Sequence, residues 1–185
     1  MSSEVNHFSD KVFVTNILNG KIQDFAIVVK NTEKLVTQIV RKMTENEDDQ
    51  KDLVQDIYLK AYQNLSSFQF KSKLSTWIAN IAYNTTINYL QKKKVPIIGI
   101  EGTIESKFIV TENPELVAIK TETLEILNAA IDKLPPLYKT LITLYHLEEL
   151  PNKEISEITN LPEGTIKSYL FRARKILKDN INHHY

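Results

Sequence analysis

Near the C-terminus, one stretch carries basic, hydroxyl and aromatic side chains at a spacing that would place them together on a helix. From Gly164 to Lys178 there are five bases and no acid. In an α-helix of 3.6 residues per turn, Ile166, Leu170, Ala173 and Leu177 would line the buried side. The opposite side would then carry Lys167, Ser168, Phe171, Arg172, Lys175 and Lys178. Such side chains can donate to phosphates and base edges, so the helix is suited to a DNA major groove.

A short amphipathic segment directly before this stretch is suited to support it. Residues Asn152–Thr159 predict a short helix with Ile155 and Ile158 turned inward. Asn160 follows at a position where a tight turn needs a residue that tolerates positive φ. Pro162-Glu163 fits the first turn of the next helix, through the fixed φ of proline and the helix dipole. The sequence therefore predicts a helix-turn-helix, with a helical hairpin bearing a solvated basic face as the alternative.

Aromatic, amide and lysine side chains also gather in the first half of the chain. Between Ile57 and Ile100 there are six lysines and no acid. The segment Leu74–Leu90 predicts a helix with Asn80, Tyr83 and Asn84 on one side. A surface of this kind suits single-stranded DNA, because each stacked base contributes about 1–3 kcal/mol and the lysines contact phosphates.

Three other aromatic residues of this half are expected to be core rather than contact residues, namely Tyr62, Trp77 and Tyr89. Asn80 and Asn84 differ from them because an amide is costly to bury without a partner. These two amides therefore favour the binding interpretation over the core interpretation.

A run of acids precedes these residues. The stripe from Leu53 to Leu65 predicts a helix whose exposed side carries Asp52, Gln55, Asp56 and Gln63. Their carboxylates could meet a basic protein surface. The alternative is an ordinary helix start, where the helix dipole favours acids.

The composition predicts a mostly helical protein with charges segregated along the chain. Its 185 residues include 23 acids, 23 bases, no cysteine, four glycines and six prolines. The lack of cysteine excludes disulfides and thiolate chemistry, and few glycines and prolines favour long helices over a turn-rich β fold. No signal peptide is visible, and no apolar stretch is long enough to cross a bilayer, so we expect a cytoplasmic protein without membrane insertion.

The pattern of apolar residues divides the chain in two. Weaker helices are expected at 11–18 and 22–43, with a break at Asn19-Gly20, and another helix at 124–134 ends at Pro135-Pro136. Between Val95 and Pro114 the periodicity fails and acids accumulate. We therefore expect an all-α fold with an N-terminal helical domain (1–94), an irregular acidic linker (95–117) and a C-terminal helix-turn-helix domain (118–185).

Two segments together resemble a known family. Asp52–Tyr62, Leu74–Asn84 and Leu90–Lys94 resemble conserved region 2 of the sigma-70 family of RNA polymerase sigma factors. Leu134–Pro136 and Ile155–Leu177 resemble region 4. The two regions occur in the family's order with no room for a region 3 domain between them. This arrangement is similar to the compact extracytoplasmic-function (ECF) group.

The resemblance implies a non-enzymatic factor that binds core RNA polymerase, directs it to promoters and helps to open the DNA. It implies four groups of residues. Those matching the helix that docks on the β′ clamp are Asp52, Gln55 and Asp56. Those matching the loop that captures a flipped minus-10 base include Phe68, Phe70, Lys71 and Lys73. Those on the helix that opens and holds this element are Asn80, Tyr83 and Asn84. Those matching the helix that reads the minus-35 element are Lys167, Ser168, Phe171, Arg172 and Lys175.

The resemblance implies core RNA polymerase (through its β′ clamp and β flap) and promoter DNA as partners, with an anti-sigma factor as a further candidate. No cofactor, metal or catalytic residue is expected. Two other classes compete with this interpretation. A stand-alone helix-turn-helix regulator would bind duplex DNA without polymerase. A nuclease or metal hydrolase would have to use the acids near Asp48 with His183-His184, which lack ligand spacing.

Overall fold

The computed structural model describes residues 2–97 and 127–182, and these fold into helices and loops without a strand. The predicted all-α class is therefore confirmed. No helix in the described ranges is both long and apolar enough to span a membrane. The greater part of the predicted acidic linker, residues 98–117, lies outside the described residues.

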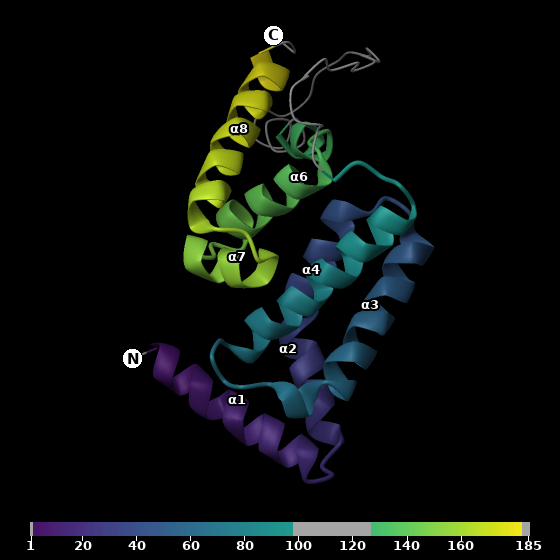
Figure 1. Cartoon of the computed structure of the whole chain (residues 1–185), viewed down its shortest axis with the longest axis vertical. Coiled ribbons are helices and arrows are strands. Elements are labelled where there is room, and N and C mark those ends of the chain that lie inside the picture. The colour runs from purple at the N-terminus through teal and green to yellow at the C-terminus, as the bar shows by residue number, and fades with distance from the viewer. Residues whose placement is uncertain (1, 98–126, 183–185) are drawn as a thin grey trace, which may run out of the picture.

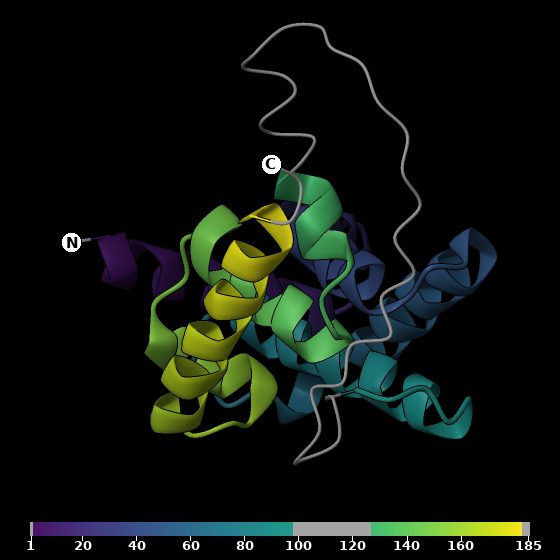
Figure 2. The ribbon, with the colours of Figure 1, turned by 90° about the horizontal axis from the view of Figure 1, so that it is seen from above.

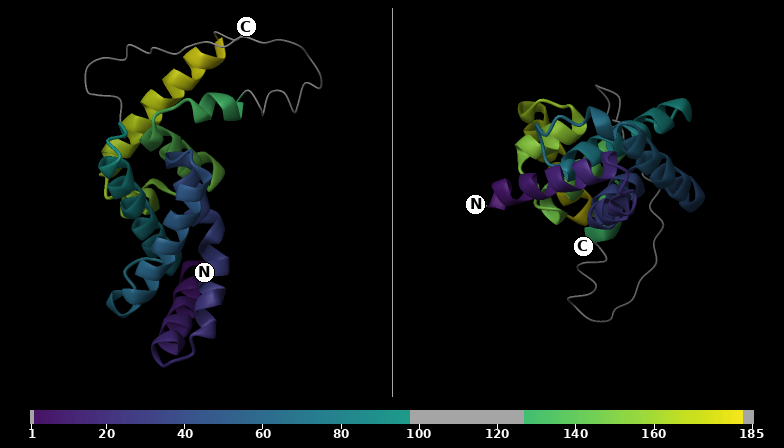
Figure 3. Two further views of the ribbon diagram at one scale, coloured as in Figure 1. Left: turned by 90° about the vertical axis from the view of Figure 1, so that its right-hand side faces the viewer. Right: turned by 90° about the horizontal axis from the view of Figure 1, so that it is seen from below.

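The chain begins with an antiparallel pair of helices, α1 (Ser2–Leu18) and α2 (Gln23–Met43). Helix α1 starts well before the predicted Lys11. The two helices separate at the predicted break, where Gly20 adopts a φ of 95° that a residue with a Cβ rarely adopts. Figure 3 shows α1 lying beside the N-terminal half of α2, which it contacts.

Helices α3 (Glu47–Gln63) and α4 (Leu74–Lys92) complete the N-terminal bundle. The side chain of Asn46 caps α3 by accepting from the backbone N–H groups of Asp48 and Asp49, both at 2.9 Å. A short 3₁₀ turn, η1 (Leu65–Ser67), follows α3. Helices α2, α3 and α4 contact one another around a core whose fully buried members include Val36, Val40, Ile57, Ile78 and Ala82.

The C-terminal half consists of a helical segment at 127–132 and of α6 (Pro136–Ile142), η2 (Thr143–Leu147), α7 (Asn152–Thr159) and α8 (Glu163–Asn182). The element η2 is a π-helical turn that directly continues α6. Asn160 joins α7 to α8 with a φ of 58°, which confirms the predicted left-handed turn. Ile155 and Ile158 are fully buried, again as predicted.

The two halves pack directly against each other. Helix α6 contacts α2, and α7 lies along α4 (Figure 1). Two ion pairs bridge the α2 side, Lys34–Glu148 and Lys42–Asp132, each at 3.0 Å. From above, α8 and α3 lie on opposite sides of the molecule (Figure 2).

Candidate nucleic-acid interface

Helix α8 presents the predicted basic face to solvent. Lys167, Ser168, Phe171, Arg172 and Lys175 are all exposed, whereas Ile166 and Ala173 on the opposite side are fully buried. Phe171 is 70% exposed, which is unusual for so large an apolar side chain. The geometry confirms the predicted division of this helix into a buried and an exposed side.

The middle of α8 contacts the π-helical turn η2 through Arg174. The guanidinium of Arg174 donates to Nε2 of His146 from its Nε at 3.3 Å, and it lies 5.5 Å from the ring centre of Tyr145. Burial, and secondarily the Arg174 charge, lower the pKa of His146. A neutral imidazole is the form that can accept this hydrogen bond.

The loop before α4 is built around a cluster of tilted aromatic rings. The ring centre of Phe68 lies 4.8 Å from that of Phe70 and 5.3 Å from that of Trp77. Phe70 adopts a φ of 57°, which is unfavourable for a residue with a Cβ. Lys71 is exposed, whereas Phe68 is 6% exposed. Phe68, which the resemblance assigns to the base-capturing loop, is therefore buried in this conformation, where it packs against Trp77.

The amide-bearing face of α4 is covered by α7. The side-chain amide of Asn80 donates to the carbonyl oxygens of Glu157 and Ile158, at 3.0 and 2.9 Å. These carbonyls belong to the last turn of α7, so Asn80 partly satisfies the C-terminal end of a helix from the other half. Asn84 in turn donates to the backbone and side-chain oxygens of Asn80. Both amides are therefore paired within the protein.

Helix α7 also binds the start of α4 through one acid. Glu154 accepts from Lys73 Nζ at 2.9 Å and from Thr76 Oγ1 at 2.6 Å. This carboxylate is buried, with 9% of the residue exposed, so its two partners offset a large desolvation cost. Lys73, predicted to contact DNA, is thus held by a protein carboxylate.

Tyr83 is buried as well, with 6% of the residue exposed. Burial, reinforced by Tyr169 of α8, raises the pKa of Tyr83 to about 12. The expected exposure of Tyr83 is therefore wrong for this conformation. The physical reason lies in the packing of the two halves of the chain, which helical periodicity within α4 does not report.

The acidic side of α3 faces solvent. Asp52 and Gln55 are exposed, and Asp56 is half-exposed and pairs with Lys60 one turn later at 2.6 Å. At the start of the same helix, Asp49 accepts from Lys93 of α4 at 2.8 Å, and this hydrogen bond lowers the pKa of Asp49.

Of the three aromatic residues expected in the core, none is fully buried. Trp77 and Tyr89 are half-buried against the core, whereas Tyr62 is 40% exposed and packs edge-on against Phe25, with ring centres 5.1 Å apart. The prediction for Tyr62 is wrong, because this residue lies at the edge of the apolar side of α3, where its ring remains partly in solvent.

Sequence reasoning missed Glu154 and Thr76. An acid in the first turn of a short helix has an ordinary explanation in the helix dipole, and its partners lie 81 and 78 residues away. Among the described residues, no group of three or more histidine or acidic side chains could hold a metal ion. His183-His184, considered for a hydrolase, lie outside the described residues.

Two family models match the chain. The model of sigma-70 region 2 matches residues 28–95, and the model of sigma-70 region 4 matches residues 124–177. These ranges include most of α2, all of α3, α4, α6 and α7, and most of α8.

Relatives are similar along nearly the whole chain. The ECF RNA polymerase sigma factor SigW of Bacillus subtilis is 32% identical over 176 residues, covering 91% of this chain and 94% of the relative. The ECF RNA polymerase sigma-E factor of Escherichia coli K12 is 32% identical over 181 residues, covering 94% of each chain.

Two solved structures share the fold. CnrH, solved in complex with the cytosolic domain of CnrY, has a TM-score of 0.67 at 17% identity and covers 95% of this chain and 99% of its own. The sigma factor RpoE of Bartonella quintana, in complex with the anti-sigma factor NepR, has a TM-score of 0.64 at 22% identity. It covers 86% of this chain and 98% of its own.

Proposed function

Because the chain belongs to the ECF group of sigma-70 RNA polymerase sigma factors, non-enzymatic proteins that direct the polymerase to promoters, we propose how its residues divide this work. Residues 1–94 bind core polymerase and the minus-10 element, residues 118–185 bind the minus-35 element, and residues 95–117 connect them. The chain works in the cytoplasm.

The exposed face of α8 is the minus-35 reader. Its lysines and arginine donate to phosphates and to the acceptors of base edges in the major groove. Phe171 projects between them and can contact a thymine methyl group, while Ser168 and Arg172 flank it on the same side. The exposure of this face carries the proposal, because the other proposed DNA surface is partly covered by α7.

The loop residues Phe68, Phe70, Lys71 and Lys73, with Asn80, Tyr83 and Asn84 of α4, form the minus-10 surface. Lys73 and Asn80 now bind α7, so these groups reach DNA only after α7 has moved away. Because α7 belongs to the C-terminal half, the two halves must separate when one chain binds both elements.

Separation of the halves can be followed directly because the chain has no cysteine. Two cysteines introduced at exposed positions, Gln63 of α3 and Lys178 of α8, would accept a donor and an acceptor dye. We expect energy transfer to fall when core polymerase is added and not when an unrelated protein is added. Unchanged transfer in an active complex would contradict the separation.

Asp52, Gln55 and Asp56 form the docking surface for the β′ clamp, and the C-terminal half meets the β flap. Asp56→Arg reverses a charge on a half-exposed helix side, so core polymerase should co-purify poorly with the variant while its helical circular dichroism remains normal. Glu33→Arg, an exposed acid on α2, serves as the control. Equal recovery of polymerase with both variants would overturn the docking assignment.

Run-off transcription with core polymerase tests the whole proposal. Core polymerase with this chain should give a transcript of defined length from promoters of its genome, and core polymerase alone should give none. A chain that binds duplex DNA equally well without polymerase, and that adds no transcript, would instead be a stand-alone regulator.

We also propose an anti-sigma factor as a partner. The support is the packing of the two halves, which buries part of the minus-10 surface and gives a second protein a compact target to hold. An anti-sigma factor that binds this arrangement should lose affinity when Glu154 is replaced by lysine. Unchanged affinity would place its binding surface elsewhere.

A further inference from the structure

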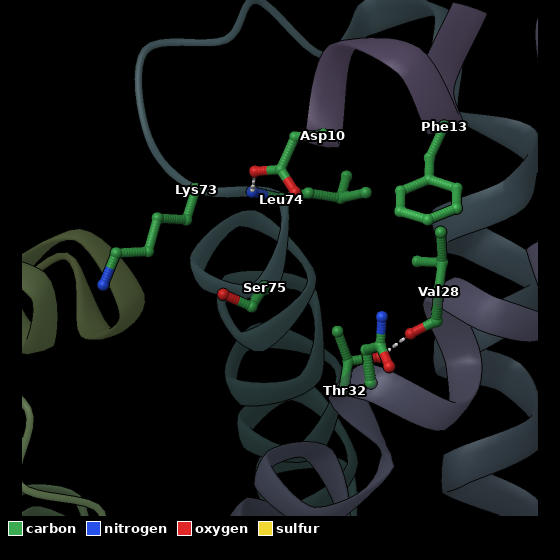
Figure 4. Close-up of a pocket in the computed structure, with 8 residues that line it drawn as sticks. Asp10, Phe13, Val28, Thr32, Lys73, Leu74 and Ser75 are labelled. Carbon is green, nitrogen blue, oxygen red and sulfur yellow. Dashed lines mark hydrogen bonds between the residues drawn. The ribbon is translucent and has the colours of Figure 1, made fainter. Parts of the chain in front are cut away.

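Helix α1 makes a contact that no sequence motif indicates. One carboxylate oxygen of Asp10 accepts from the backbone N–H of Leu74 at 2.8 Å, across 64 residues of chain. Figure 4 shows Asp10 descending from α1 onto the first residue of α4. The contact lies at the rim of a cavity of about 200 Å³ between α1, α2 and α4.

Helix α4 lacks a cap of its own. Its N-cap residue, Lys73, makes no side-chain capping bond, and no acid stands in its first turn. The first backbone N–H groups of a helix have no partner within the helix, and a carboxylate near them is favoured by the dipole. Asp10 supplies from another helix what an aspartate at the N-cap would supply locally.

The capped end is where the base-capturing loop joins α4. The loop carries Phe70 at an unfavourable φ and ends at Lys73, whose carbonyl accepts from the backbone N–H of Trp77 at 3.1 Å. Helix α1 also contacts η1, which precedes the loop. The same helix therefore braces the loop at both ends, through η1 and through Leu74.

Resting on the proposed minus-10 role of this loop, we propose that Asp10 is a positioning residue for promoter opening. It fixes the end of the loop that presents Phe70 and Lys71, and it touches no DNA itself. Lys73 points away from Asp10 toward α7 (Figure 4), so the aspartate can hold the backbone while the lysine side chain remains free to change partners.

Three variants separate this role from general stability. Asp10→Ala removes the acceptor, whereas Asp10→Asn keeps an acceptor oxygen of nearly the same reach. Asp24→Ala is the matched control, because Asp24 also bonds across the α1–α2 pair, accepting from Asn16 at 2.8 Å, but does not contact the loop.

We expect the holoenzyme with Asp10→Ala to open promoters about 10-fold less, measured as permanganate reactivity, with core binding and minus-35 duplex binding unchanged. Asp10→Asn should restore most of the opening, and Asp24→Ala should match the natural chain. Equal losses in Asp10→Ala and Asp24→Ala would show that α1 acts only through overall packing and would overturn the proposal.

A second readout does not depend on transcription. Trp77 is the only tryptophan of the chain and its ring contacts that of Phe68 in the loop, so its emission reports the loop directly. Asp10→Ala should shift this emission to longer wavelength at unchanged helix content, and Asp10→Asn should not. If the natural holoenzyme opens no promoter, the proposed function is wrong. The emission of Trp77 still tests whether Asp10 positions the loop. Unchanged emission in Asp10→Ala would overturn that role.

Discussion

The two proposed DNA surfaces of this sigma factor differ in exposure: one lies in solvent and the other is partly covered. The minus-35 face of α8 is exposed along its length, with Phe171 70% in solvent. The minus-10 surface is partly covered, because Lys73 and Asn80 bind α7 and Tyr83 is buried. The covering element is the first helix of the same helix-turn-helix whose second helix carries the exposed face.

The difference teaches how one small domain can present one surface and protect another. A helix-turn-helix needs only its second helix to read DNA, so its first helix is available for other contacts. Here α7 meets α4 with a buried acid and with two carbonyls of its last turn, which are groups that need partners. The amide and lysine of the minus-10 surface provide them. An amide and an ammonium group are hydrogen-bond donors, so they bind the acceptors of α7 for the same reason that they suit the acceptors of bases and phosphates.

The largest effect should come from disrupting the contact of α7 with α4, which covers the minus-10 surface. Glu154→Lys places a positive charge against Lys73 and removes the acceptor of Thr76. Helix α7 should then separate from α4, and the fraction of molecules with an uncovered minus-10 surface should rise. The free variant should bind a single-stranded minus-10 oligonucleotide about 30-fold more tightly in fluorescence anisotropy. Glu157→Gln, an exposed side chain on the same helix, should bind like the natural chain. If the natural chain already binds the oligonucleotide as tightly as Glu154→Lys, then α7 does not restrict access of DNA to the minus-10 surface.

A substitution on the exposed face of α8 should instead weaken DNA binding. Phe171→Ala removes a solvated aromatic side chain without a core role, so duplex binding at the minus-35 element should weaken about 10-fold at an unchanged melting temperature. Leu147→Ala, another exposed apolar side chain of this half, is the control. If both variants bind alike, Phe171 does not contact DNA.

A smaller change isolates the phosphate contacts of the same face. Lys175→Ala should lower the slope of log affinity against log salt by about 1, because one fewer counterion is released on binding. Lys153, an exposed base on α7, gives the comparison variant Lys153→Ala, whose slope should equal that of the natural chain. A slope in Lys175→Ala that is also unchanged argues against a phosphate contact there.

The smallest effect concerns the support of α8. The pKa of His146 is lowered in the fold, so the unfolded chain binds more protons between the folded value and 6.5, and stability falls as the pH drops through that window. Between pH 7.5 and 5.5 the natural chain should lose about 2 °C more in melting temperature than His146→Gln, which does not titrate. Equal losses would mean that the Arg174 contact does not depend on the neutral imidazole.

Much of the fold was predictable because its signals are local. The apolar stripe of α8, the positive φ at Asn160 and the breaks at Gly20 and Pro135-Pro136 each depend on neighbours in sequence. The exposed face of α8 followed from the same periodicity. The expected exposure of Tyr83 was wrong because this residue is buried beside Tyr169, a residue far away in sequence.

The sequence by itself determined the helical class and the exposed basic face of α8, since spacing within a helix decides which residues share a side. Its motifs indicated the family by resemblance. Only the tertiary structure decided that Glu154 holds Lys73 and Thr76, that Asn80 binds the end of α7, and that Asp10 caps α4. These contacts join residues 64 to 81 positions apart. Each depends on the relative placement of whole helices, which follows from how their apolar faces pack together.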